Sequence, residues 1–249
     1  MFDNSMIFNR TELLLGEDAM RRLQQARVII FGVGGVGSWT AMALARTGIG
    51  HLTIVDADKV AVSNINRQAQ ATVDTVGEVK VEAMRQMLLA VNPRLDVVAL
   101  EKEYNQQTAE EFDLESYDFI VDAIDSLSAK ALLIRQATAA KHPVLLSSMG
   151  AALKLDPTKI SVAEFWKVQG CPLAAALRRR FRKSGDMPRR QFRCVYSPEL
   201  LPNRGATEGD LGDTAMTYNK VATNGSLCHI TAIFGLTMAG LIVQDIATQ

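Results

Sequence analysis

A glycine-rich turn followed by two cations could hold a polyphosphate. The turn reads Gly32-Val-Gly34-Gly35-Val-Gly37 and follows the apolar run Val28–Phe31. Glycine lets the backbone approach a phosphate closely, and the amides at a helix N-terminus carry partial positive charge. Because many nucleotide-binding domains contain such a turn, it does not by itself choose between ATP and a nicotinamide cofactor.

Three polar residues that follow the turn favour ATP. Arg67 lies in the block Ser63–Gln68, Lys80 opens the third helical segment, and Asn64 adds a neutral donor. A triphosphate that loses pyrophosphate needs cations, because charge builds on the leaving group. A nicotinamide site has less need of them, since its pyrophosphate already lies on the glycine turn. We therefore predict that these three side chains contact phosphates, the alternative being that they are solvated surface groups.

Carboxylates follow two of the expected strands. Asp56 lies 19 residues beyond Gly37, where an acid accepts hydrogen bonds from ribose hydroxyls; the alternative is that it caps a turn. Asp122 and Asp125 follow a later strand, and one of them could hold Mg²⁺, which prefers oxygen ligands. Asp125 is favoured because it lies further past the strand end. Capping of the next helix by Asp125 or Ser126 is compatible with that role.

Composition limits the classes of protein. The 249 residues suit one large domain, and the formal net charge is zero, so any contact with nucleic acid must be local. The three cysteines, Cys171, Cys194 and Cys228, are far apart in sequence, which excludes a four-cysteine site, and no structural zinc is expected. An odd cysteine count and a polar N-terminus without an export signal predict a reducing, cytoplasmic location.

Short apolar runs alternate with helical segments in the first 150 residues. This alternation predicts an α/β fold with a doubly wound, mostly parallel, Rossmann-like sheet. The carboxyl ends of its strands should bring Gly32, Asp56, Asp122 and Asp125 to one crevice. The expected strands are Val28–Phe31, Leu52–Val55, Asp96–Leu100, Phe119–Val121 and Val144–Ser147, and the expected helices include Trp39–Ala45, Val79–Val91 and Ala129–Ala140.

The second half of the chain is less regular. Ile160–Phe165 predicts a strand, and four prolines with dense arginine predict an irregular crossing segment over about 166–213. A helix over about 226–246 is apolar enough to suggest a membrane span, but His229 and several small polar residues favour a buried or interface helix. We expect one adenylation-type domain over 1–249, with its nucleotide-binding part at 10–150.

A basic cluster lies within that crossing segment. Only Asp186 opposes it, and two neighbouring aromatic side chains, Phe181 and Phe192, could stack on bases. Phosphate contact and base stacking are typical of RNA binding, so RNA contact is expected; the alternative is a solvated helix face. The basic residues are Arg178, Arg179, Arg180, Arg182, Lys183, Arg189, Arg190 and Arg193.

Several of these motifs, in order, resemble the ubiquitin-activating-enzyme-like (ThiF/MoeB/HesA) adenylation family. They are Gly32–Gly37, Val55–Asp58, Ser63–Gln68, Lys80 and Val121–Asp125. The resemblance implies ATP-dependent adenylation of a carboxylate with release of pyrophosphate.

The resemblance also implies roles for single residues. By it, Asp56 would hold ribose, Asn64, Arg67 and Lys80 would hold phosphates, and Asp125 would hold magnesium. Asp58 and Gln68 complete the implied nucleotide-binding set. Arg10 looks like the family's N-terminal arginine, which reaches into a neighbouring subunit's site, so a homodimer is implied. The implied catalytic set is therefore Arg10, Arg67, Lys80 and Asp125.

A narrower resemblance is to the tRNA threonylcarbamoyladenosine dehydratase branch of that family. It is carried by Ala43–Gly50, Pro172–Arg178, Cys194–Glu199 and Thr231–Gly235. It implies a tRNA substrate, whose threonyl carboxylate is activated and then lost in a ring closure. The nucleophile lies within the substrate, so no enzyme cysteine is required, and intramolecular attack can gain ~7–11 kcal/mol.

Other functions stay open at the level of sequence. An activator of a small sulfur-carrier protein would use a reactive thiolate, and the nearby arginines could lower the pKa of Cys171 or Cys194. The chain nevertheless lacks the paired zinc cysteines of those activators. A nucleotide-dependent scaffold that receives sulfur from a cysteine desulfurase system is a second alternative, and a nicotinamide-dependent oxidoreductase is a third.

Overall fold

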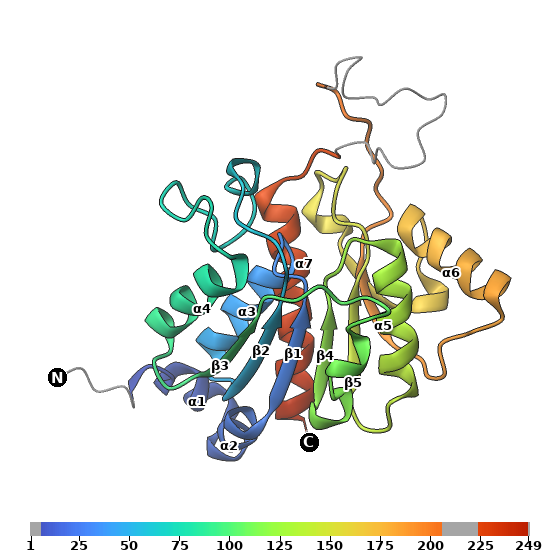
Figure 1. The fold of residues 1–249 in the computed structure, drawn as a ribbon. Coiled ribbons are helices and arrows are strands. Elements are labelled where there is room, and N and C mark those ends of the chain that lie inside the picture. Colours follow the sequence, from blue (N-terminus) through green and yellow to red (C-terminus); the bar gives the residue numbers. More distant parts are fainter. Residues whose placement is uncertain (1–5, 206–223, 249) are drawn as a thin grey trace.

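One seven-stranded sheet organises the chain (Figure 1). The computed structural model describes residues 6–205 and 224–248. The strand order is β3-β2-β1-β4-β5-β7-β6, and every neighbouring pair is parallel except β6 with β7. The strands are β1 (Arg27–Phe31), β2 (His51–Val55), β3 (Asp96–Leu100), β4 (Phe119–Asp122), β5 (Val144–Ser148), β6 (Ser161–Glu164) and β7 (Arg193–Tyr196).

Within the described residues, seven α-helices surround the sheet. They are α1 (Asn9–Leu15), α2 (Glu17–Gln25), α3 (Gly37–Thr47), α4 (Lys80–Val91), α5 (Leu127–Ala139), α6 (Pro172–Ser184) and α7 (Cys228–Ala247). Short 3₁₀ turns lie at Val62–Asn64, Ala109–Glu111, Leu114–Ser116, Pro157–Lys159 and Phe165–Lys167. These elements confirm the predicted doubly wound α/β fold.

Strand β1 explains why both faces of the sheet are covered. Its side chains alternate, so Val28 and Ile30 enter one hydrophobic core while Ile29 and Phe31 enter the other. The first core packs the sheet against α2, α3, α4 and α7, and the second packs it against α5, α6 and the turns after β3. Burial of four successive apolar residues, 28–31, is typical of a strand in a parallel sheet covered on both sides.

The order of the strands reverses between β1 and β4. The chain moves outward from β1 to β3 and then returns to place β4 on the other side of β1. Ligands of such sheets bind beyond the carboxyl ends of the strands at this reversal. Phe31 pairs in register with Val55 and Asp122, so the segments that follow β1, β2 and β4 begin at the same level.

The arginine-rich segment is more regular than its sequence predicts. We expected an irregular stretch over about 166–213, but it contains the 13-residue helix α6 and strand β7. Pro172 occupies the first turn of α6, where its missing N–H costs nothing. Ala174, Leu177 and Phe181 form the buried face of this helix. The part of the expected segment beyond residue 205 lies outside the described residues.

Helix α7 is the apolar C-terminal helix predicted from the sequence. By length and composition it could cross a membrane, but half of its apolar window is buried within the fold. It runs behind the sheet beside α3 (Figure 1). Gly235 permits this contact, because a Cβ there would lie 2.4 Å from the carbonyl oxygen of Val36. The helix is therefore part of the core, as expected.

Candidate nucleotide site

The glycine turn after β1 has the geometry of a phosphate-binding turn. Gly32 has φ +90°, and a Cβ there would lie 2.7 Å from Ala123 O, in the segment after β4. At Gly37 a Cβ would lie 1.8 Å from Gly32 O, so only glycine lets α3 start this close to β1. Gly34 differs, because its nearest neighbour would be Gln68 Nε2 at 4.0 Å. Gly32 thus permits the tight turn, Gly37 permits close packing of α3 on β1, and Gly34 leaves space for a ligand to approach. These are the three glycine roles of a dinucleotide-binding turn.

Asp56 fastens the glycine turn to the end of β2. Its Oδ2 accepts a hydrogen bond from Val33 N at 2.7 Å, and its Oδ1 accepts one from Asp58 N at 2.9 Å. Each carboxylate oxygen can accept a second hydrogen bond, so the side chain keeps capacity for a hydroxyl donor. The turn-capping and ribose-binding readings of Asp56 are therefore compatible.

Lys80 is a buried cation at the first position of α4. The residue is 6% exposed, and its Nζ lies 2.7 Å from Asp58 Oδ2. The Asp58 side chain itself is 72% exposed, so the pair has one solvated and one desolvated partner. A desolvated ammonium attracts an anion more strongly than a solvated one, because less solvent screens it.

The segment Arg67–Gln70 is fixed above the start of α3. Trp39 Nε1 donates to Arg67 O at 2.9 Å, and Ala69 N donates to Ser38 Oγ at 3.1 Å. Gln70 Nε2 donates to Val33 O at 2.8 Å. These three bonds hold the segment Arg67–Gln70 against the glycine turn and the first turn of α3.

Two of the predicted phosphate ligands make local hydrogen bonds. Arg67 is half-buried, and its Nη1 donates to Ser63 O and Asn66 Oδ1, both at 2.9 Å. Asn64 is 8% exposed and accepts a bond from Ala61 N at 3.0 Å. Asn64 therefore shapes the turn that presents Arg67, and phosphate contact by either residue stays a prediction.

The carboxyl end of β4 contains a buried ion pair that sequence reasoning missed. Lys130 Nζ lies 2.9 Å from Asp122 Oδ2, and both side chains are fully buried. Ser147 Oγ donates to the same oxygen at 2.6 Å, and Lys130 Nζ also donates to Ile124 O at 2.9 Å. Burial raises the pKa of Asp122, while Lys130 and Ser147 lower it. The sequence signal was a lysine inside the apolar stretch Ala129–Ile134.

Asp125 differs from Asp122 in being exposed to solvent. It lies between β4 and α5, beyond the bond from Lys130 to Ile124 O. Ser126 is the N-cap residue of α5, but its side chain makes no capping hydrogen bond. Of the two carboxylates, only Asp125 is exposed, and its role in magnesium binding stays a prediction.

Arg10 lies away from this site in its own chain. The ring of Phe8, just before α1, comes within 3.4 Å of where a Cβ on Gly48 would lie, at the C-terminal end of α3. The glycine turn lies at the other end of that 11-residue helix, which is ~16 Å long at 1.5 Å per residue. The structure therefore does not bring Arg10 to Arg67, Lys80 or Asp125 of the same chain.

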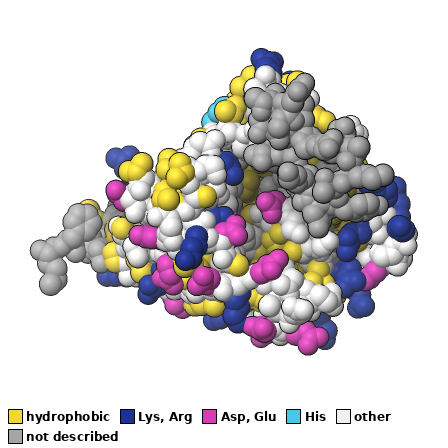
Figure 2. Space-filling view, turned by 45° about the horizontal axis from the view of Figure 1, so that its top comes forward, with side chains coloured by type: hydrophobic (Ala, Val, Ile, Leu, Met, Phe, Trp, Pro, Cys, Tyr) yellow, Lys and Arg dark blue, Asp and Glu magenta, His cyan; other side chains and the backbone are white. Residues whose placement is uncertain are grey.

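The basic cluster divides into anchored and exposed members. Arg178 donates to Phe165 O and Val168 O, Arg193 pairs with Asp245, and Arg190 donates to four main-chain carbonyls near the end of α5. Arg179, Arg180, Arg182, Lys183 and Arg189 are exposed, and Arg190 is exposed as well despite its four bonds. Figure 2 shows basic side chains along its right-hand edge, the side on which Figure 1 places α6. RNA contact by these residues stays a prediction.

The expected stacking role of Phe181 and Phe192 is wrong. Phe181 is 1% exposed and Phe192 is 5% exposed. Both contact Phe165, and Phe192 stacks on it with ring centroids 4.9 Å apart. Their apolar surface is needed to attach α6 and β7 to the sheet, so their rings are not available to bases.

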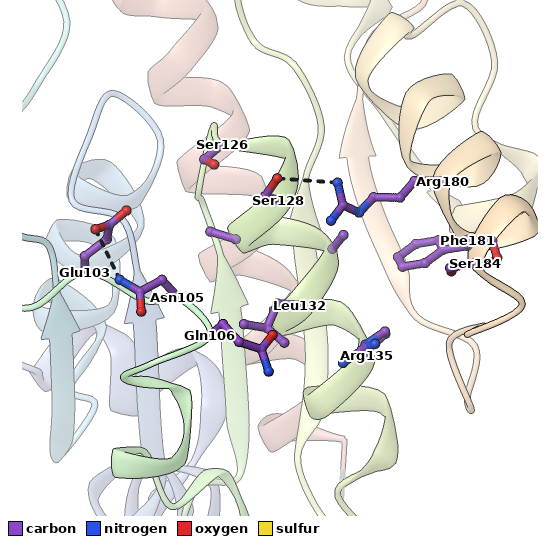
Figure 3. A pocket seen from close by; sticks show the side chains of 12 residues that line it. Glu103, Asn105, Gln106, Ser126, Ser128, Leu132, Arg135, Arg180, Phe181 and Ser184 are labelled. Carbon is purple, nitrogen blue, oxygen red and sulfur yellow. Dashed lines mark hydrogen bonds between the residues drawn. The ribbon is translucent and has the colours of Figure 1, made fainter. Parts of the chain in front are cut away.

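A pocket of about 330 Å³ lies between α5, α6 and the loop after β3 (Figure 3). Arg180 reaches across it to Ser128 Oγ at 3.4 Å. The pocket does not include the glycine turn, so it is not the phosphate site. Ser126, which directly follows Asp125, is part of its wall. The pocket therefore borders the segment that presents the candidate magnesium ligand.

Two of the cysteines lack the environment of a nucleophile. Cys171 is 4% exposed and Cys194 is fully buried. Burial raises the pKa of the Cys194 thiol well above its usual range, and nearby Lys130 only partly opposes this. A buried, protonated thiol is a poor nucleophile. Cys228 is exposed, at the first residue of α7.

Comparison with known proteins gives one consistent family. The sequence pattern of the ThiF family matches residues 8–248. The tRNA threonylcarbamoyladenosine dehydratase of Bacillus subtilis (strain 168) is 35% identical over 241 residues, covering 96% of this chain and 94% of that protein. The enzyme of the same name from Escherichia coli (strain K12) is 35% identical, covering 92% of this chain and 88% of that protein.

Solved structures agree with the sequence comparison. The crystal structure of E. coli tRNA N6-threonylcarbamoyladenosine dehydratase in complex with ATP has a TM-score of 0.83 and 33% identity, and it covers 97% of this chain and 93% of that chain. The same enzyme in complex with AMP has a TM-score of 0.82. E. coli MccB has a TM-score of 0.63 at 16% identity, a likeness of fold alone.

Proposed function

The chain belongs to the ThiF family, and we propose that it is an ATP-dependent dehydratase acting on threonylcarbamoyladenosine in tRNA. The observation that carries this proposal is similarity to enzymes of that name along nearly the whole chain. The matched range, residues 8–248, includes the glycine turn, Lys80 and the α6–β7 segment.

The chemistry follows from adenylation. A carboxylate oxygen of the threonyl group attacks the α-phosphorus of ATP, and pyrophosphate leaves. An atom of the substrate's own carbamoyl group then attacks the activated carbonyl carbon, so that the ring closes and AMP departs with the former carboxylate oxygen. In this reaction Lys80 and Arg67 stabilise charge on the leaving pyrophosphate, and the amides of the glycine turn hold the phosphates.

Buried cysteines favour this function over sulfur-carrier activation. A thioester route needs an accessible thiolate on the crossing segment, and both cysteines of that segment, Cys171 and Cys194, are buried. Ring closure needs no enzyme nucleophile. The absence of an accessible cysteine between residues 166 and 205 is therefore compatible with the dehydratase.

The test is pyrophosphate release by the purified chain with ATP and tRNA. Fully modified tRNA should support release and yield a nucleoside lighter by one water molecule in mass spectrometry. The same tRNA without the threonylcarbamoyl group should support neither. If folded, ATP-binding protein gave no pyrophosphate with the modified tRNA, the substrate assignment would be wrong.

The exposed basic face of α6 is the surface we propose for the tRNA backbone. Arg179 and Lys183 are exposed, and neither side chain pairs with a carboxylate among the described residues. Replacing both Arg179 and Lys183 by glutamate should raise the KM for tRNA, because each lost phosphate contact weakens binding of the nucleic acid. The Kd for ATP should stay unchanged, because neither residue lies at the glycine turn. An unchanged KM for tRNA would contradict this surface.

Asp125 is the residue we propose to hold Mg²⁺. Its exposed carboxylate beyond β4 suits a hard cation, and such an ion would neutralise phosphate charge during adenylation. Asp125→Ala should raise the magnesium concentration that gives half-maximal turnover by about tenfold or more, because one anionic ligand is lost. A magnesium titration equal to that of the unchanged chain would exclude this role.

We also propose a homodimer in which Arg10 acts in the partner's site. Helix α1 has no buried residue, and Leu13 and Leu14 beside Arg10 are 80% and 82% exposed. Exposed apolar side chains of this size are typical of an interface.

Mixing two inactive variants tests the dimer. Arg10→Ala and Lys80→Ala chains, combined after subunit exchange, should regain about a quarter of normal activity, because half of the dimers are mixed and each holds one complete site. A mixture no more active than either variant alone would show that Arg10 does not act across an interface.

A further inference from the structure

Two glutamine side chains form a buried pair beside the glycine turn. Gln70 is fully buried and Gln68 is 6% exposed. Gln70 Nε2 donates to Val33 O at 2.8 Å and to Gln68 Oε1 at 3.3 Å. Because a main-chain carbonyl can only accept, Val33 requires the NH₂ end of the Gln70 amide. The orientation of Gln70 is therefore set by its partners.

The pair also sets the orientation of Gln68. Its Oε1 accepts from Gln70, so its Nε2 is the end directed elsewhere. That nitrogen lies 4.0 Å from the position that a Cβ would take on Gly34. It donates to none of the described residues. An amide with two N–H donors thus faces the one glycine of the turn that has open space around it.

The bond to Val33 has a second effect on the turn. In a trans peptide the carbonyl oxygen and the following N–H point in opposite directions. Since Gln70 holds Val33 O on its own side, the N–H of Gly34 is directed away from Gln70. Gly34 N makes no main-chain hydrogen bond within the described residues. One side chain therefore orients two donors of the turn.

We propose that Gln70 is a positioning residue for nucleotide binding, which aims the Gln68 amide and the Gly34 N–H at the phosphates of ATP. The inference rests on the proposed function in one respect, namely that the turn holds the phosphates of a nucleotide. Gln70 itself, fully buried behind Val33, does not touch the ligand. Its effect is to hold neutral donors in place before the nucleotide arrives, which lowers the cost of ordering them.

The test is the Kd for ATP, measured by calorimetry without tRNA. Gln70→Met keeps the length of the side chain but removes the donor, and it should raise the Kd about five- to tenfold, as expected for misplaced hydrogen bonds. Gln68→Met should also raise it. In the double variant the Kd should rise by less than the product of the two single-variant increases, because both substitutions act through the same amide. A Kd unchanged by Gln70→Met, or two fully independent effects, would overturn the proposal.

A matched control separates positioning from stability. Asn92 is another buried amide, 3% exposed, which accepts a bond from Arg94 N at the end of α4. Asn92→Leu should lower the Tm and leave the Kd for ATP unchanged. If it raised the Kd as much as Gln70→Met did, loss of stability would explain both results and the proposal would fall.

A second variant gives a pH readout. Gln70→Glu has the shape of glutamine, but an ionised carboxylate cannot donate to Val33 O, whereas a protonated one can. Burial raises the pKa of such a carboxyl, so the Kd of this variant for ATP should improve relative to the unchanged chain as the pH is lowered. A ratio of the two Kd values that is independent of pH would overturn the proposal.

The outcomes are separable from those of the dehydratase assay. If the unchanged chain binds ATP and shows the pattern above but does not convert modified tRNA, the substrate assignment fails and the role of Gln70 stands. If it converts tRNA but Gln68→Met leaves the Kd for ATP unchanged, the role of Gln70 fails and the function stands. If it binds no ATP, both fail.

Discussion

Lys80→Met lowers the rate of tRNA-dependent pyrophosphate release by about 10²–10³-fold, the usual cost of removing one preorganised donor from a developing negative charge. Lys80 suits this role because it is buried while its only partner among the described residues, Asp58, is solvated. Methionine retains the packing of the lysine stem. Asp58 stays in water, so no unpaired charge is buried and the Tm should change little.

Single-turnover measurement of pyrophosphate release checks this result, with Lys59→Met as the control. Lys59 is an exposed lysine in the segment between β2 and α4, close to Lys80 in sequence. Its replacement should leave the rate within twofold of normal, since a solvated charge contributes little to a desolvated site. Retained activity in Lys80→Met would exclude a catalytic role for Lys80. A Tm lowered by many degrees would indicate a structural role instead.

Lys130→Met should lower the free energy of unfolding by about 3–5 kcal/mol, because it leaves the Asp122 carboxylate buried without its cation. For a chain of this length that corresponds to a fall in Tm on the order of 10 °C. The double variant Asp122→Leu, Lys130→Met should recover most of the loss, since apolar pairs of similar size often replace buried ion pairs at little cost. Calorimetric melting of the three variants measures this recovery.

The loss in Lys130→Met should also depend on pH. Burial raises the pKa of Asp122 above its ordinary value of 3.8, and Lys130 opposes that rise. Without Lys130 the folded-state pKa is higher still, so the folded chain binds a proton at a pH where the unfolded chain does not. Stability of the variant therefore increases as the pH falls through that raised pKa. A difference in Tm from the unchanged chain that is the same at pH 8 and pH 5 would contradict this account.

The sequence predicted the sheet well because its strands are short apolar runs bounded by turn residues. Strand β3, for example, has the predicted bounds Asp96–Leu100. The sequence pattern does not predict helix α6, because Pro172 resembles a helix breaker and the dense arginines obscure the buried spacing of Ala174, Leu177 and Phe181. In this case the tertiary burial of one helix face outweighed a local pattern that resembled a loop.

The sequence predicts which residues form the candidate site, but it predicts their arrangement only in part. Asp56 and the glycines lie next to strand ends, and a strand end has a known place in a parallel sheet. Lys80 opens a helix, and the sequence places it only by residue type and order. Contacts between distant segments carry no such local signal. The Asp122–Lys130 pair and the bonds from Arg190 to the end of α5 depend on how α5 packs, which sequence spacing does not specify.

The Arg190 guanidinium attaches the segment between α6 and β7 to the end of α5. It donates to Ala137 O and Thr138 O in the last turn of α5, and to Lys141 O and Pro143 O in the link to β5. A hinged lid made of α6 and β7 would have to break all four bonds at once and leave those carbonyls without a donor. We therefore expect the segment between α6 and β7 to stay attached to the end of α5 and not to move as a lid.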